Sequence, residues 1–213
     1  MRKNEYVTDC SDIDDIIVFK KDGKMIVTKV ASKTFVGKDI IHLAVFKKKD
    51  TRTVYNMMYR DGKGGASYMK RFSVTGVTRD KDYDLTPGKS NTIVHYFSAN
   101  PNGEAEVVTV LLRAVGSIKK LKWDIDFADL AVKGRGVRGN TITKFAIRKV
   151  EFKSSGVSTL KPRKIWFDDA VQRLNVDARG ELLGEFRAED KILIATQSGK
   201  IKAVTPDLQM HFE

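Results

Sequence analysis

Hydrophobic residues recur along the chain in short runs with a two-residue period. In the segment 120–127, Leu121, Trp123, Ile125 and Phe127 alternate with charged residues, which places the apolar side chains on one face of a strand. No segment keeps the helical spacing of apolar positions for three turns. We therefore expect an all-β fold. Similar runs predict further strands at 15–19, 25–30, 40–46, 54–59, 68–74, 92–97, 106–112, 141–147, 164–167, 182–186, 191–195 and 201–204.

A strand–turn–strand unit is repeated along the chain. Segment 16–26 aligns with 192–202, so that Gly23 and Gly199 share a turn position, and degenerate copies surround Gly62 and Gly116. The successive glycines are 39, 54 and 83 residues apart, and the last interval is long enough to contain another repeat. Repeats of about 50 residues with several strands favour propeller blades. We expect a single domain over 1–213 with about four to five blades, closed or open and incomplete, and a flexible leader over 1–11.

Composition adds a strong positive charge. The 213 residues carry a formal net charge of +12, and the pI is about 9.7. Between positions 115 and 155, ten lysines and arginines stand against four acidic residues. Such an excess favours a polyanionic partner, foremost nucleic acid, although a basic surface that only keeps the domain soluble is the alternative. The sequence shows neither a spanning apolar run nor a signal-peptide core, so we expect a soluble cytoplasmic protein without membrane contact.

Candidate chemistry is sparse. Cys10 is the single cysteine, and the three histidines are scattered, so we expect neither a disulfide, nor a zinc site, nor a nucleophile–base pair. Asp124 and Asp126 could suggest magnesium, but the alternation makes them the solvent face of a strand. The segment 88–90 resembles the end of a phosphate-binding loop, yet Tyr83 stands where its first glycine must be. We predict no catalytic residue, no metal and no cofactor in this domain.

Segment 134–139, Gly-Arg-Gly-Val-Arg-Gly, resembles the glycine and arginine segment in blades of the β-pinwheel domain of gyrase and topoisomerase IV A subunits. The segments 59–65, 70–81 and 97–104 resemble topoisomerase IV A subunits of the Bacteroides group, and the similarity runs from about Asp12 to the C-terminus. The resemblance implies a C-terminal, propeller-like disc that exchanges strands between blades and bends duplex DNA around a basic perimeter. It further implies binding without sequence specificity and presentation of a DNA segment for strand passage.

The resemblance favours topoisomerase IV, with a role in decatenation or relaxation during chromosome segregation. The box Gln-Arg-Arg-Gly-Gly-Lys-Gly, which gyrase needs for wrapping, is absent, and this absence argues against gyrase-type supercoiling. A gyrase-type wrapping domain is therefore kept only as the alternative. No Arg-Tyr pair occurs, so we expect no DNA cleavage by this chain. The implied partners are the N-terminal catalytic part of the same A subunit and the B subunit of a heterotetramer, in which ATP and Mg²⁺ act on other domains of a nucleoid-associated enzyme.

Two groups of basic residues are the candidate DNA contacts. For the glycine-flanked arginines of the first group the alternative is an ordinary tight turn, and for the second group it is a solvated face. Trp123 and Tyr68 are expected to pack in the core, because duplex DNA keeps its bases paired. Two other functions stay open: a basic-rimmed protein-interaction propeller, and a propeller hydrolase, for which no carboxylate or histidine cluster is evident. The first group of candidates comprises Lys119, Lys120, Lys122, Lys133, Arg135, Arg138 and Lys144, and the second comprises Lys63, Lys70, Arg71, Arg79 and Lys81.

Overall fold

The computed structural model describes residues 6–114, 116, 118–187, 189–208 and 210–212. Their contacts form two compact units, Met1–Gly156 and Val157–Glu213, and each is described here by itself. Apart from one short 3-10 turn, η1 (Phe127–Asp129), every regular element in this part of the chain is a β-strand, which confirms the predicted all-β class. None of the described residues forms a helix long and apolar enough to cross a membrane.

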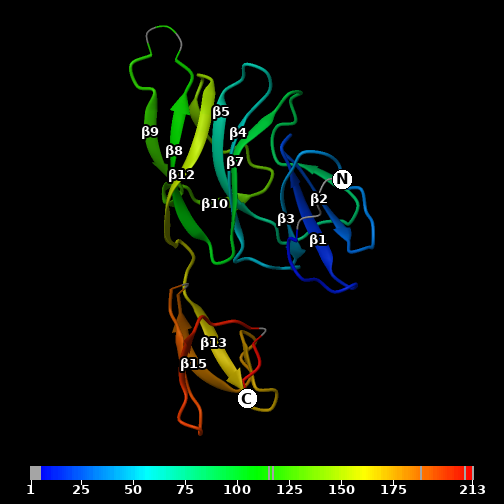
Figure 1. Cartoon of the computed structure of the whole chain (residues 1–213), viewed down its shortest axis with the longest axis vertical. Helices are drawn as coiled ribbons and strands as arrows, with labels where there is room; N and C mark the ends of the chain where they lie inside the picture. Colours follow the sequence, from blue (N-terminus) through cyan, green and yellow to red (C-terminus); the bar gives the residue numbers. More distant parts are fainter. Residues whose placement is uncertain (1–5, 115, 117, 188, 209, 213) are drawn as a thin grey trace. The chain divides into compact units, whose positions relative to one another are not determined.

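Unit 1 contains three sheets (Figure 1). The first has the order β3-β1-β2-β6 and consists of β1 (Asp15–Lys20), β2 (Lys24–Lys29), β3 (Ile40–Phe46) and β6 (Asp82–Asp84). The second has the order β10-β5-β4-β7, and β11 also pairs with β5; it consists of β4 (Val54–Arg60), β5 (Ser67–Ser73), β7 (Ile93–Asn100), β10 (Val132–Gly134) and β11 (Asn140–Thr143). The third has the order β12-β8-β9 and consists of β8 (Glu104–Leu112), β9 (Lys122–Asp126) and β12 (Ile147–Ser158).

Neighbouring sheets of unit 1 exchange strands. Strand β6 follows β5 along the chain, yet it pairs with β2 of the first sheet, where Tyr83 lies opposite Met25. Strands β10 and β11 follow β9 of the third sheet, yet both pair with β5 of the second. This is the exchange between blades that the family resemblance implied.

The second sheet is buried on both faces. Because side chains alternate along a strand, Met57 of β4 packs in a core cluster with the first sheet, and the adjacent Met58 packs in a cluster with the third. Six consecutive residues of β4 are buried, as expected for a strand covered on both sides. Neighbouring layers therefore enclose any side chain in the middle of this sheet, whatever its polarity.

Unit 2 contains two small sheets. The larger has the order β14-β13-β15, with β13 (Arg163–Asp168), β14 (Arg173–Asn175) and β15 (Glu181–Phe186); the smaller is the hairpin of β16 (Ile192–Ala195) and β17 (Ile201–Val204). Among its described residues, Ile165, Leu174, Val204 and Pro206 are the buried apolar ones. The larger sheet lies in the long interval between Gly116 and Gly199, where the sequence left room for another repeat. The described residues thus form five sheets in the two units, in agreement with the predicted four to five blades.

The repeated turns are confirmed. Gly23, Gly62, Gly116 and Gly199 each lie between two antiparallel strands or their extensions, and their φ angles are 82°, 82°, 56° and 80°. Positive φ is the conformation for which glycine is favoured.

Several strands differ from the prediction. The expected strand 141–147 is wrong as a single element, because the chain ends β11 at Thr143 and starts β12 at Ile147. The rest of β12 was missed because it lacks alternation. Leu121 precedes β9 and is exposed, and Phe127 is buried in η1, whereas Trp123 packs against the core as expected. The short strands β6, β10 and β14 have three residues each, too few to show a period.

Candidate nucleic-acid interface

The glycine and arginine segment forms a loop at the edge of β5. This segment, Gly134–Gly139, is called the arginine loop below; it connects β10, which runs parallel to β5, with β11, which runs antiparallel to it. The chain therefore reverses direction directly over β5. Gly139 has a φ of 93°, and a Cβ atom there would lie 2.3 Å from the carbonyl oxygen of Met69, so only glycine fits this close approach.

Lys70 of β5 lies beneath the arginine loop. Its ammonium donates hydrogen bonds to the carbonyl oxygens of Arg135 at 2.6 Å and Val137 at 3.1 Å, and to that of Leu85. It also lies 4.7 Å from the centre of the Phe72 ring. Burial lowers the pKa of Lys70 to about 8, so the charged form still predominates at pH 7. The carbonyl groups of the loop thus turn inward onto a buried cation.

Arg135 is held by a tyrosine of the exchanged strand β6. Its guanidinium lies 4.5 Å from the centre of the Tyr83 ring and donates a hydrogen bond to the carbonyl of Gly76 at 2.8 Å. The ammonium of Lys81 lies 5.4 Å from the same ring. Thr78 donates its backbone N–H to the Tyr83 hydroxyl at 2.8 Å, and hydrogen bonding to Thr78, first through its side chain and then through this N–H, lowers the pKa of Tyr83. Two cations predicted to belong to separate patches therefore meet at one aromatic ring.

Arg138 contacts a different tyrosine, which is itself stacked on another tyrosine ring. Its guanidinium lies 5.0 Å from the centre of the Tyr68 ring, which stacks on Tyr59 at 5.5 Å between centroids. The Tyr59 hydroxyl donates to the carbonyl oxygen of Arg138 at 2.7 Å. Burial raises the pKa of Tyr59, which keeps this donor protonated. The Arg138 side chain itself is exposed, so a charged group is presented to solvent from a fixed backbone.

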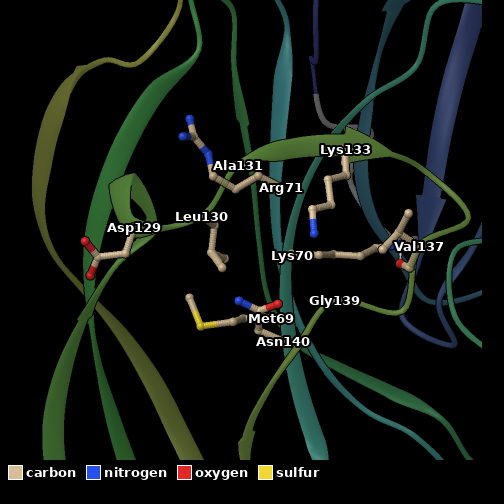
Figure 2. Close-up of a pocket in the computed structure, with 10 residues that line it drawn as sticks. All are labelled: Met69, Lys70, Arg71, Asp129, Leu130, Ala131, Lys133, Val137, Gly139 and Asn140. Atoms are coloured by element: carbon tan, nitrogen blue, oxygen red, sulfur yellow. Dashed lines mark hydrogen bonds between the residues drawn. The ribbon is translucent and has the colours of Figure 1, made fainter.

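A cavity of about 250 Å³ lies between the arginine loop, β5 and the chain before β10 (Figure 2). Lys133, Asp129 and Asn140 are among its lining residues. Figure 2 shows Lys70 extending toward Val137, whereas Arg71 extends to the opposite side. Lys133 is exposed and directly precedes the arginine loop in the sequence, so it is a third cation near Arg135 and Arg138 along the chain.

Lys70 and Arg71 do not belong among the direct DNA contacts. They are only 4% and 1% exposed, because the sheets on both sides of β5 enclose them. Arg71 donates to the side-chain oxygen of Asn56 at 3.0 Å and to the carbonyl oxygens of Gly103 at 2.9 Å and Glu104 at 3.2 Å. The prediction that these two cations face DNA is corrected accordingly: both are internal donors to backbone carbonyls.

The other predicted residues lie on separate surfaces. Arg79 forms a 2.7 Å ion pair with Asp15, and Lys63 is exposed in the loop after β4, near the 3.2 Å ion pair of Lys89 with Asp61. No contact between described side chains brings the remaining candidates onto the arginine loop. These are the exposed residues Lys119 and Lys120 in the segment before β9, Lys122 at the first position of β9, and Lys144 between β11 and β12.

Sequence reasoning missed the supports of the arginine loop. Tyr83 and Tyr59 carried no local signal, because the strands that bring them to the loop are distant in the chain.

Asp124, which could suggest magnesium, is bonded to protein side chains instead. It accepts a hydrogen bond from Thr109 at 2.7 Å and pairs with Lys153, and both partners lower its pKa. Within the described residues, no group of three or more histidines, cysteines or acids is placed to hold a metal ion.

The exchanged strands, the doubly covered sheet and the basic loop at its edge define a propeller-like all-β domain of the β-pinwheel class. The sequence model of one family, described as the topoisomerase C-terminal domain of Bacteroidota, matches residues 2–154 and 173–213. The chain belongs to this family, and the resemblance to the C-terminal domain of a type II topoisomerase A subunit is confirmed.

Among solved structures, the DNA gyrase A C-terminal domain is similar, with 13% sequence identity and a TM-score of 0.34, over 92% of this chain and 74% of that chain. No curated protein matches the chain.

Proposed function

We propose that this domain binds and bends duplex DNA for a type II topoisomerase of the topoisomerase IV kind. In this proposal it takes no part in cleavage and holds a DNA segment for strand passage by the N-terminal catalytic part of the A subunit and by the B subunit. ATP and Mg²⁺ would act on those other parts. Membership in the topoisomerase C-terminal domain family and the net charge of +12 support a DNA-binding role.

One observation carries the proposal: cations from two distant segments meet around the arginine loop. Lys81 and Arg135 both contact the ring of Tyr83. Arg138, which follows Arg135 closely in the sequence, contacts the ring of Tyr68. Stacking on an aromatic ring limits the conformational freedom of a guanidinium while leaving donors for a phosphate. Less entropy is therefore lost when DNA binds than with free side chains.

The expected mode of binding is electrostatic. Arginines and lysines that contact phosphates displace condensed counterions, so the affinity falls with salt and does not depend on base sequence. Bending 20–30 base pairs costs on the order of 1–6 kcal/mol, and contacts along a curved surface can offset it.

The test measures the affinity for a duplex by fluorescence anisotropy from low to physiological salt. Each phosphate contact contributes about −0.9 to the slope of log K against log salt, so the variant Arg135→Ala/Arg138→Ala should flatten the slope by about one to two units. A matched control is Lys47→Ala/Lys48→Ala, which removes two exposed charges from another loop of unit 1. Equal slopes for the two variants would refute a specific role of the loop. Weak, salt-insensitive binding by the unmodified domain would favour a protein-interaction propeller.

The role of this domain within the enzyme must be tested with the complete heterotetramer. Removing the two loop arginines should reduce decatenation of linked circles more than ATP hydrolysis without DNA, because the catalytic parts are unchanged. Constrained positive writhe in a topology assay with relaxed plasmid would instead favour gyrase-type wrapping.

A further inference from the structure

A single buried ammonium lies where three segments of unit 1 meet. Lys70 comes from β5 of the second sheet, Leu85 directly follows β6 of the first sheet, and Arg135 and Val137 belong to the arginine loop. All three acceptors are backbone carbonyls, so these bonds fix the path of the chain, whatever the side chains around them do. No described acidic side chain forms an ion pair with Lys70.

The same ammonium fixes both partners of the Arg135–Tyr83 contact. One hydrogen bond holds the backbone of Arg135 itself. Another holds Leu85, which is two residues after Tyr83 and closes the exchanged strand β6. The end of β6 is held to the first sheet by its pairing with β2 and by the N–H of Leu85, which donates to the carbonyl of Gly23 at 2.8 Å; the Lys70 bond ties the same end to the second sheet.

The cost of burying this charge indicates what removing it would do. An ammonium without water needs hydrogen-bond acceptors, and here the loop supplies two of the three. Without the ammonium, those carbonyls would lose their donor inside unit 1 and would be more stable in water. The loop would then leave the edge of β5 and take Arg135 with it.

We propose that Lys70 is the positioning residue of the DNA-binding surface: its ammonium holds the arginine loop and the end of β6 together so that Arg135 faces DNA in a fixed place. Lys70 itself contacts no phosphate. This inference rests on the proposed DNA-binding function for its biological meaning, but the order of the loop can be measured without DNA.

The first experiment measures hydrogen exchange of the peptide that covers 134–139 in the whole chain, by mass spectrometry. Lys70→Met keeps an unbranched side chain that is one heavy atom shorter and removes the ammonium, and the exchange rate of this peptide should rise at least tenfold. The matched control is Arg71→Met, which removes the neighbouring buried cation on the opposite side of β5. Selective loss of protection in the Lys70 variant supports the proposal; an unchanged loop, or equal loss in both variants, overturns it.

The second experiment covers the case in which Lys70→Met does not fold. Lys70→Ala leaves a space that propylammonium fits, because its three carbons and nitrogen replace the atoms removed. Recovered protection of the loop with propylammonium, and not with tetramethylammonium at equal ionic strength, supports the proposal. Protection that is independent of the amine overturns it.

DNA affinity then separates the two ideas. If the proposed function is correct, Lys70→Met should flatten the salt slope about as much as Arg135→Ala, although Lys70 is 4% exposed. If neither variant changes the slope while the loop loses protection only in the Lys70 variant, the positioning role stands and the proposed function fails.

Discussion

Gly139→Ala should detach the arginine loop from β5. The φ of 93° at this position lies outside the region that side chains favour, which by itself costs roughly 1–3 kcal/mol. In addition, the new Cβ would lie 2.3 Å from the carbonyl oxygen of Met69 and 2.9 Å from the Cβ of Lys70. The first of these is backbone in a paired strand, which cannot shift without disturbing β5. We expect a loss of about 2–4 kcal/mol in the free energy of unfolding.

The assay combines urea unfolding with the salt dependence of duplex binding. The control is Gly136→Ala in the same loop, where an added Cβ meets no atom within 4 Å and no positive φ is required. Gly139→Ala should lower the urea midpoint and flatten the salt slope, and Gly136→Ala should change neither. If both variants behave alike, the close packing of the loop on β5 is not what positions its arginines.

Three further predictions concern the ring support, acid stability and unit 2. Tyr83→Leu removes the ring beneath Arg135 and should weaken duplex binding about two- to fivefold, whereas Tyr83→Phe should bind like the unmodified domain in the same anisotropy titration. Burial, with help from nearby cations, lowers the pKa of His95 from 6.5 to about 4; the unfolded chain binds more protons between these values, so stability should fall as the pH drops through this window. The loss is about 2 kcal/mol after allowance for partial exposure, and His95→Gln should flatten that part of a urea-midpoint profile. Gly180→Ala places a Cβ 2.0 Å from the Phe167 carbonyl at a φ of 79° and should lower the melting temperature of unit 2 by several degrees in a thermal scan.

The sequence predicted the parts of the fold that depend on neighbours in the chain. Glycine turns with positive φ, such as those at Gly23 and Gly199, are local signals, and the structure confirms them. Strand pairing over long separations left no such trace. The three-residue strand β10 pairs with β5 some 60 positions earlier, and nothing in its sequence indicates that partner. The existence of blades was therefore predictable, whereas the exchange of strands between them came only from the family resemblance.

The candidate site shows the same division. Arg135 and Arg138 were identified because glycines flank them, and the structure places both at the edge of a sheet with their side chains on tyrosine rings. Lys70 and Arg71 have an equally basic sequence context, yet they are buried. Alternation along β5 indicates two faces and cannot show that other layers cover both. Only the positions of the first and third sheets decide which basic residues reach solvent.

The buried cations explain why the arginine loop is part of the fold and not an appendage. A charge can stay inside a sheet only when acceptors surround it, and Lys70 finds two of its three acceptors in the loop. Folding of the second sheet and ordering of the loop are therefore mutually dependent: the loop completes the burial of Lys70, and Lys70 fixes the loop. The positions of Arg135 and Arg138 follow from this coupling, because each arginine lies within the short stretch of chain that Lys70, Tyr59 and Gly139 hold against β5. The same six residues on another turn would have the charges without the fixed geometry. In the proposed function, this geometry would let the two arginines bind DNA at a low entropic cost.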